Sequence, residues 1–171
     1  MHSEKIMEFN DGRISGVWRG VRMSLADYTK GEHDEFRMML EQLVVTERGE
    51  VDLREDTSRT LVRRSLAHRK AEEETVFGPL LSRNDTRGPA LETLEQHKAA
   101  AAVMVNLRKV PFDDEIWLPK MIVLKILFDA HLTAEESKVL AHTADFFGGA
   151  EMNRMLEGFQ TIEKSELEKR K

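Results

Sequence analysis

Two segments of this sequence repeat one pattern, and that pattern limits what the chain can fold into. Residues 68–73 read His-Arg-Lys-Ala-Glu-Glu, and residues 131–136 read His-Leu-Thr-Ala-Glu-Glu. In each segment a His and a Glu stand four residues apart, so in an α-helix both side chains project from the same face. An imidazole and a carboxylate on one helical turn supply half of a metal site. Two such helices facing each other would supply both halves.

The spacing of two further His residues indicates a duplicated helical hairpin. His33 lies 35 residues before His68, and His97 lies 34 residues before His131. Matching Thr residues precede the two single His, and matching Val residues follow the two His-Glu pairs: Thr29, Thr93, Val76 and Val139. An internal repeat indicates that one structural unit is used twice. We therefore expect all four His to come from equivalent positions in two hairpins.

The composition favours helix, because Leu, Met, Ala, Glu, Lys and Arg dominate and aromatic residues make up only 6%. Ser24 and Asp27 have the spacing of a capping box, which predicts where the first helix begins. Pro89 suits the first position of a helix. We expect four long helices and a shorter fifth one, at residues 25–48, 56–81, 89–110, 113–147 and 151–171.

Four amphipathic helices with short connections predict an all-α fold, an up-down-up-down four-helix bundle. We divide the chain into an N-terminal strap at residues 1–22, the bundle at residues 23–145, and a C-terminal helix at residues 146–171 that packs on the bundle. Trp18 is expected to bury part of its ring where the strap crosses the bundle.

Composition also excludes several classes of function. The chain has no Cys, which leaves His and carboxylate side chains as the available metal ligands. Its net charge of −5 argues against a nucleic-acid partner. No apolar run is long enough to span a membrane, and the first eleven residues are too polar for a signal peptide. We expect a cytoplasmic protein that binds neither nucleic acid nor membrane.

Six residues are candidate metal ligands, and their chemistry suits iron. Divalent iron accepts imidazole and carboxylate together, and a carboxylate can bridge two metal ions about 3.5–4 Å apart. Two His and one Glu per metal leave positions open for a small ligand. Burying these groups among Leu, Phe and Met would be costly without a metal. The candidates are His33, His68, His97 and His131 as terminal ligands, and Glu72 and Glu135 as bridges.

Neighbouring residues are given lesser roles. Glu73, Glu74 and Glu136 are expected to be solvated charges on helix surfaces. His142 shares the inward stripe of Glu135, so it is either a fifth His near the metal or a packing residue at the bundle end. Tyr28 falls on a different side of its helix from His33 and is assigned no role.

These motifs resemble those of the hemerythrin-like, or HHE cation-binding, domains over roughly residues 25–145. The resemblance implies a four-helix bundle around a non-haem di-iron centre, with the same six residues as ligands. Family members are associated with binding or sensing of oxygen, nitric oxide, peroxide or iron. The matching motifs are Glu-His33, His68-x-x-x-Glu72-Glu73 with the tail Phe77-Gly-Pro79-Leu80, Gln-His97, and His131-x-x-x-Glu135-Glu136.

The resemblance leaves several functions open. The first is a di-iron protein that binds or senses oxygen, nitric oxide or peroxide, acting through a homodimer or a separate signalling partner. The second is an enzyme with catalase-like or ferroxidase activity at the same centre. The third is a metal-free interaction module in which the His are structural. Manganese or zinc are alternatives to iron. Classical oxygen-carrying hemerythrin has five His ligands where this sequence offers four, a departure that concerns oxygen carriage more than iron binding.

Overall fold

A computed structural model describes residues 9–10, 13–14 and 23–169 of the chain. This part is helical apart from one pair of two-residue strands, β1 (Phe9–Asn10) and β2 (Arg13–Ile14), which pair in antiparallel register. The all-α prediction is therefore confirmed. The five long helices are α1 (Leu25–Val44), α2 (Val51–Glu72), α4 (Asn84–Leu107), α5 (Trp117–Glu135) and α7 (Gly149–Lys169).

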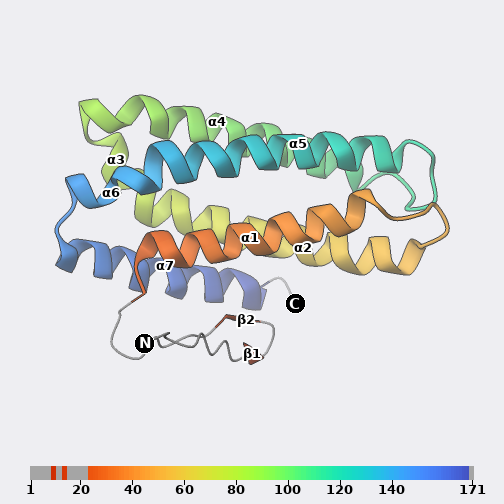
Figure 1. Cartoon of the computed structure of the whole chain (residues 1–171), viewed down its shortest axis with the longest axis horizontal. Coiled ribbons are helices and arrows are strands. Elements are labelled where there is room, and N and C mark those ends of the chain that lie inside the picture. Colours follow the sequence, from red (N-terminus) through yellow and green to blue (C-terminus); the bar gives the residue numbers. More distant parts are fainter. Residues whose placement is uncertain (1–8, 11–12, 15–22, 170–171) are drawn as a thin grey trace, which may run out of the picture.

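Four of these helices lie side by side, and consecutive ones run in opposite directions along the long axis of the molecule (Figure 1). Helix α1 packs against α2 and α5, and α4 packs against α5. The fifth long helix, α7, lies against α2 and also touches α1. The predicted strap at residues 1–22, including Trp18, falls outside the described residues except for β1 and β2. Within the described residues no helix is both long and apolar enough to cross a membrane.

Several predicted helix boundaries are wrong, and the caps explain why. Helix α1 begins at the predicted capping box, where the Asp27 backbone N–H donates to Ser24 Oγ at 3.1 Å. The residues before α2, α4 and α5 form no such side-chain bond, so the sequence carries no clear start signal there. Helices α2 and α4 each begin five residues earlier than predicted, which leaves Pro89 inside α4.

The C-terminal helix is not short. Helix α7 has 21 residues, against 20 for α1, and it begins at Gly149. Its charged end stays helical to Lys169, whose ammonium group donates to Glu166 one turn earlier at 2.8 Å. Its buried side chains are Met155, Phe159 and Glu163.

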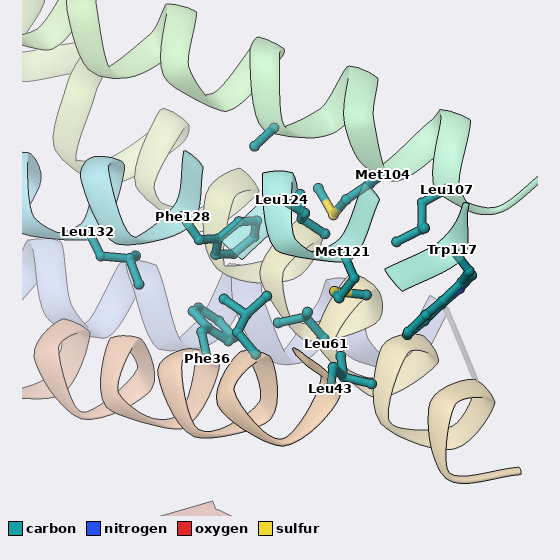
Figure 2. Packing of buried hydrophobic residues seen from close by; sticks show 12 residues of the cluster. Phe36, Leu43, Leu61, Met104, Leu107, Trp117, Met121, Leu124, Phe128 and Leu132 are labelled. Carbon is teal, nitrogen blue, oxygen red and sulfur yellow. The ribbon is translucent and has the colours of Figure 1, made fainter. Parts of the chain in front are cut away.

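The helical core consists of two apolar clusters separated by a polar layer. The first, which we call the loop-end core, lies toward the connections that follow α1 and α4 and is shown in Figure 2. The second, the α7-end core, lies toward α7 and the connection between α2 and α4. Members of the loop-end core include Phe36, Leu61, Met104 and Phe128, and members of the α7-end core include Leu25, Ala71, Ala90 and Val139.

The four His lie near the boundary between these two cores. Along α1, His33 falls between Leu25 and Phe36, and along α2, His68 falls between Leu61 and Ala71. His97 has the same position on α4, whereas His131 lies at the last residues of the loop-end core on α5, and the α7-end core resumes only after that helix. Apolar packing on both sides therefore fixes all four imidazoles at one level of the molecule.

Candidate metal centre

The four predicted His meet as two pairs whose ring nitrogens face each other. His33 Nε2 lies 3.2 Å from His68 Nε2, and His97 Nε2 lies 3.2 Å from His131 Nε2. All four side chains are buried. Each pair joins the two helices of one sequence repeat, α1 with α2 and α4 with α5. The duplication seen in the sequence thus produces two similar imidazole pairs.

The two predicted Glu link these pairs together. Glu72 Oε1 lies 3.0 Å from His68 Nε2, while its other oxygen, Oε2, lies 3.5 Å from His97 Nε2. Glu135 Oε2 lies 3.4 Å from His131 Nε2 and 3.8 Å from His33 Nε2. Each carboxylate therefore reaches both imidazole pairs, one from its own repeat and one from the other.

The donor atoms are grouped closely enough to share metal ions. One group consists of Glu72, His97, His131 and Glu135, and a second consists of His33, His68 and Glu72. Within each group the candidate ligand atoms lie within 4.8 Å of one another. Glu72 belongs to both groups, which is the position that a bridging carboxylate would take.

The buried carboxylates also lack hydrogen-bond donors. Glu72 and Glu135 are both fully buried, and none of their four oxygens accepts a hydrogen bond from the described residues. An uncompensated buried carboxylate costs several kcal/mol. Converging ring nitrogens and unsatisfied carboxylate oxygens together fit a cation, because a metal ion would coordinate both.

The backbone changes from α-helix to π-helix directly after each His-Glu pair. The π turns are η1 (Glu73–Phe77) and η2 (Glu136–Leu140), and the short helices α3 (Gly78–Leu81) and α6 (Ala141–Phe146) follow them. Isolated π turns within α-helices are frequent at functional sites. The sequence analysis did not predict these turns. Their occurrence at equivalent positions shows that the repeat extends to backbone geometry.

Each imidazole is also contacted through its other nitrogen. His33 Nδ1 lies 2.9 Å from Glu136 Oε1, and His68 Nδ1 lies 2.8 Å from Glu32 Oε2. In the other repeat the contacts to Nδ1 are longer, at 3.4 Å and 3.3 Å, and come from Glu73 to His97 and from Gln96 to His131. A partner on Nδ1 fixes the orientation of the ring and leaves Nε2 free to bind a metal.

All four of these outer residues are sequence neighbours of a candidate ligand, but each contacts a ligand on another helix. Glu136 was expected to be a solvated charge, and that expectation is wrong, because Glu136 contacts His33 and Arg37. Glu73 fits the expectation in part, since its side chain is 36% exposed and pairs with Arg69, although it also reaches His97. Glu74 does fit it, since its half-exposed carboxylate pairs with Lys70 on the helix surface. The repeat itself could have indicated a shared role for Glu73 and Glu136, because an acidic residue follows the Glu of both His-Glu pairs.

Charge and burial shift the pKa values of the two buried carboxylates, Glu72 and Glu135, in opposite directions. Despite its burial, the pKa of Glu72 lies well below its ordinary value, because the charge of His68, whose Nε2 lies 3.0 Å from Glu72 Oε1, stabilises the ionised form. Burial and the neighbouring charge of Glu72 raise the pKa of Glu135 well above its ordinary value. Burial and the negative charge of Glu72 therefore both disfavour the ionised form of Glu135 when no metal is bound. Two divalent cations would offset the repulsion between the two carboxylates.

The imidazoles differ in a similar way. Burial, followed by the charge of His97, lowers the pKa of His131 to about 3. The pKa of His68 is raised well above its ordinary value, because Glu72 and Glu32 outweigh the effect of burial. Metal binding requires neutral imidazoles, so the low pKa of His131 favours metal binding, whereas the raised pKa of His68 opposes it.

The remaining predicted residues lie outside this centre. His142 is more than half exposed and contacts Asp145 at 3.2 Å, so it is neither a fifth ligand nor a core residue. Tyr28, which was assigned no role, donates a hydrogen bond from its hydroxyl to Glu163 on α7 at 2.7 Å. Glu163, Glu32 and His68 form a third group of close candidate ligand atoms. Sequence reasoning missed Glu163 because it follows the repeated region.

A family model, the hemerythrin HHE cation binding domain, matches residues 24–142. The chain belongs to the hemerythrin HHE family. The match covers all six predicted ligands and both π turns, whereas α7 lies beyond it. No curated protein and no solved structure matches the chain significantly. Membership of this family agrees with a cation site built from the clustered His and Glu residues.

Proposed function

We propose that this chain is a non-haem di-iron protein that binds or senses oxygen, nitric oxide or peroxide. The observation that supports this most strongly is the placement of Glu72 and Glu135. Each carboxylate is fully buried, lacks hydrogen bonds from the described residues, and lies between imidazole pairs of the two repeats. Such a carboxylate suits two metal ions better than one.

The ligand set supports two similar metal positions. In the proposed centre His33 and His68 would hold one iron, and His97 and His131 would hold the other. Glu72 and Glu135, which lie between the two imidazole pairs, would be shared by both ions. The antiparallel arrangement of α1, α2, α4 and α5 is then the four-helix bundle of the hemerythrin family.

The absence of thiolate ligands favours iron or another metal that accepts nitrogen and oxygen donors. When bound, ferrous iron can donate electrons to a small ligand, and the coordination positions not filled by protein side chains are open to that ligand. The protein supplies rigid placement, because apolar cores hold the four His from both sides. It also supplies charge, since Glu32, Glu73 and Glu136 lie behind three of the imidazoles and add to the attraction for cations.

Anaerobic reconstitution with ferrous iron tests this function. The loaded protein would be exposed separately to oxygen, nitric oxide and peroxide, and visible absorption would be recorded. We expect a new absorption band that saturates at a fixed ratio of ligand to di-iron centre. Glu72→Gln should abolish the band, while the surface variant Glu74→Gln should preserve it. Iron-loaded protein that responds to none of the three ligands would contradict the proposal. Sustained peroxide consumption would instead support the enzymatic alternative.

A further inference from the structure

A glutamate from outside the family region lies behind one imidazole of the candidate metal centre. Glu163 belongs to α7, beyond the matched residues 24–142, yet its side chain is only 5% exposed. Its carboxylate oxygen lies within 4.8 Å of both a Glu32 oxygen and a His68 ring nitrogen. A buried carboxyl group on an otherwise apolar helix face needs polar partners.

Those partners form a continuous chain of contacts from α7 to His68. The Tyr28 hydroxyl donates to Glu163 Oε2 at 2.7 Å, and His68 Nδ1 lies 2.8 Å from Glu32 Oε2. Burial, followed by the nearby Glu32, raises the pKa of Glu163 to about 8. Glu163 therefore links Tyr28 to the residue that contacts His68.

Aromatic packing holds the same region. The Phe159 ring, one turn before Glu163 on α7, lies edge-on to His68 with ring centres 5.3 Å apart. It also contacts Tyr28 edge-on, at 5.7 Å. Helix α7 thus contacts His68 through the Phe159 ring, and it also places the Glu163 carboxyl group close to Glu32 and His68.

The second repeat has a different arrangement at the equivalent place. Gln96 stands where the first repeat has Glu32, and its amide oxygen lies 3.3 Å from His131 Nδ1. Among the described residues, the close group of candidate ligand atoms that contains His131 consists of Glu72, His97, His131 and Glu135, and it includes no residue of α7. Two metal positions built from duplicated helices thereby acquire different surroundings.

We propose that Glu163 is a positioning residue that holds Glu32 against His68, so that α7 fixes the orientation of one imidazole of the centre. This positioning role concerns the protein alone and can be tested without bound metal. A further consequence is that the two metal positions differ in affinity, and this consequence rests on the proposed function. Glutamine can both accept from Tyr28 and donate to Glu32, so Glu163→Gln should preserve the chain of contacts and Glu163→Leu should break it.

The test is the exchange of the His68 Nδ1 proton with water, measured by NMR on the full chain labelled with ¹⁵N-histidine. It is run on chelator-treated protein and again after addition of zinc, with His131 as the internal reference. We expect exchange at His68 to become at least tenfold faster in Glu163→Leu and to stay within twofold of wild type in Glu163→Gln. Met155→Ala, which loosens another buried contact of α7, controls for packing and should also stay within twofold.

The outcomes separate the two proposals. Exchange in Glu163→Leu within twofold of wild type would overturn the positioning role, as would equal acceleration in Met155→Ala. If Glu163→Leu does not fold, Tyr28→Phe provides a second test, because it removes the hydrogen bond to Glu163. We then expect exchange of the His68 Nδ1 proton to be at least threefold faster than in wild type. A rate within twofold of wild type overturns the positioning role. Zinc titration of wild type reports separately on the centre: no zinc uptake counts against the metal function, while the chelator-treated spectra still decide the role of Glu163. With two zinc ions bound, Glu163→Leu should weaken one binding step about tenfold.

Discussion

At the scale of single residues, Glu72 and Glu135 are the side chains whose burial is most costly. Two fully buried carboxylates without hydrogen bonds from the described residues repel each other, and the raised pKa of Glu135 is one result. Only a compensating positive charge resolves this, from a proton or from a metal ion. We propose that a metal takes this role, because the ring nitrogens of four His converge on the same oxygens.

Removing the charge of either carboxylate should therefore weaken metal binding. We predict that Glu72→Gln or Glu135→Gln retains at most one metal ion per chain after dialysis, because an amide cannot bridge two cations as a carboxylate does. Metal content by mass spectrometry gives the measurement, with Glu74→Gln as the matched surface control. Two metals retained in Glu72→Gln would show that this carboxylate is not a ligand.

A second prediction concerns Glu136 and the stability of the fold at low pH. The hydrogen bond from His33, followed by Arg37, lowers the pKa of Glu136 from 4.5 to about 2 in the folded protein. Because the folded value is the lower one, the contribution of Glu136 to the free energy of unfolding is complete above pH 4.5 and is lost as the pH falls toward 2. Urea unfolding of chelator-treated wild type and Glu136→Gln should show a stability difference that shrinks below pH 4.5. A difference independent of pH between 3 and 6 would contradict this assignment.

The cluster of six candidate ligands could be predicted from sequence because a duplication records its residues twice. Glu72 and Glu135 share a register with His68 and His131, and a helix places them on one face whatever its exact ends. The outer residues were missed because their partners lie on other helices. Contacts such as those from Glu32 to His68 and from Glu73 to His97 depend on helix packing, and spacing within one helix does not reveal packing.

At the scale of elements, the first helix start was predictable and the next two were not. Ser24 and Asp27 form a complete capping box, whereas Glu50 and Arg83 cap α2 and α4 without a side-chain hydrogen bond. The π turns after Glu72 and Glu135 could not be predicted from the sequence either, since no residue type is specific to them. These turns carry Glu73 and Glu136 to the imidazoles that they contact.

The contact between α7 and η1 gives a prediction on stability. A Cβ atom added at Gly158 would lie 3.2 Å from the Thr75 methyl group, whereas one added at Gly31 in α1 meets nothing within 4 Å. Gly31→Ala should stabilise the fold by about 0.5–1 kcal/mol through helix propensity. Gly158→Ala should gain less, or lose stability, unless Thr75→Ser removes the methyl group. Urea unfolding of the single and double variants measures this. Equal gains at both glycines would show that α7 does not approach η1 this closely.

At the scale of the whole molecule, the centre joins four helices that are otherwise held by two separate apolar cores. A metal bound between those cores stabilises the folded state alone, since the unfolded chain has no preformed site. At a free metal concentration of 1,000 times Kd the gain is about 4 kcal/mol. A chain of this size gains about 2–4 °C in Tm per kcal/mol.

We therefore expect chelation to lower the Tm of metal-loaded protein by about 10 °C. Thermal unfolding followed by circular dichroism gives the measurement, and the same chelator should leave the Tm of Glu72→Gln nearly unchanged. An identical Tm with and without chelator in wild type would support a metal-free bundle in which the His are structural.

The most direct test of the central claim is the metal content of the wild-type chain. The protein would be purified without a metal-affinity tag from iron-supplemented cells, and metals would be counted by mass spectrometry. We expect close to two iron atoms per chain. No metal as purified, and none taken up on anaerobic reconstitution with ferrous iron, would contradict it.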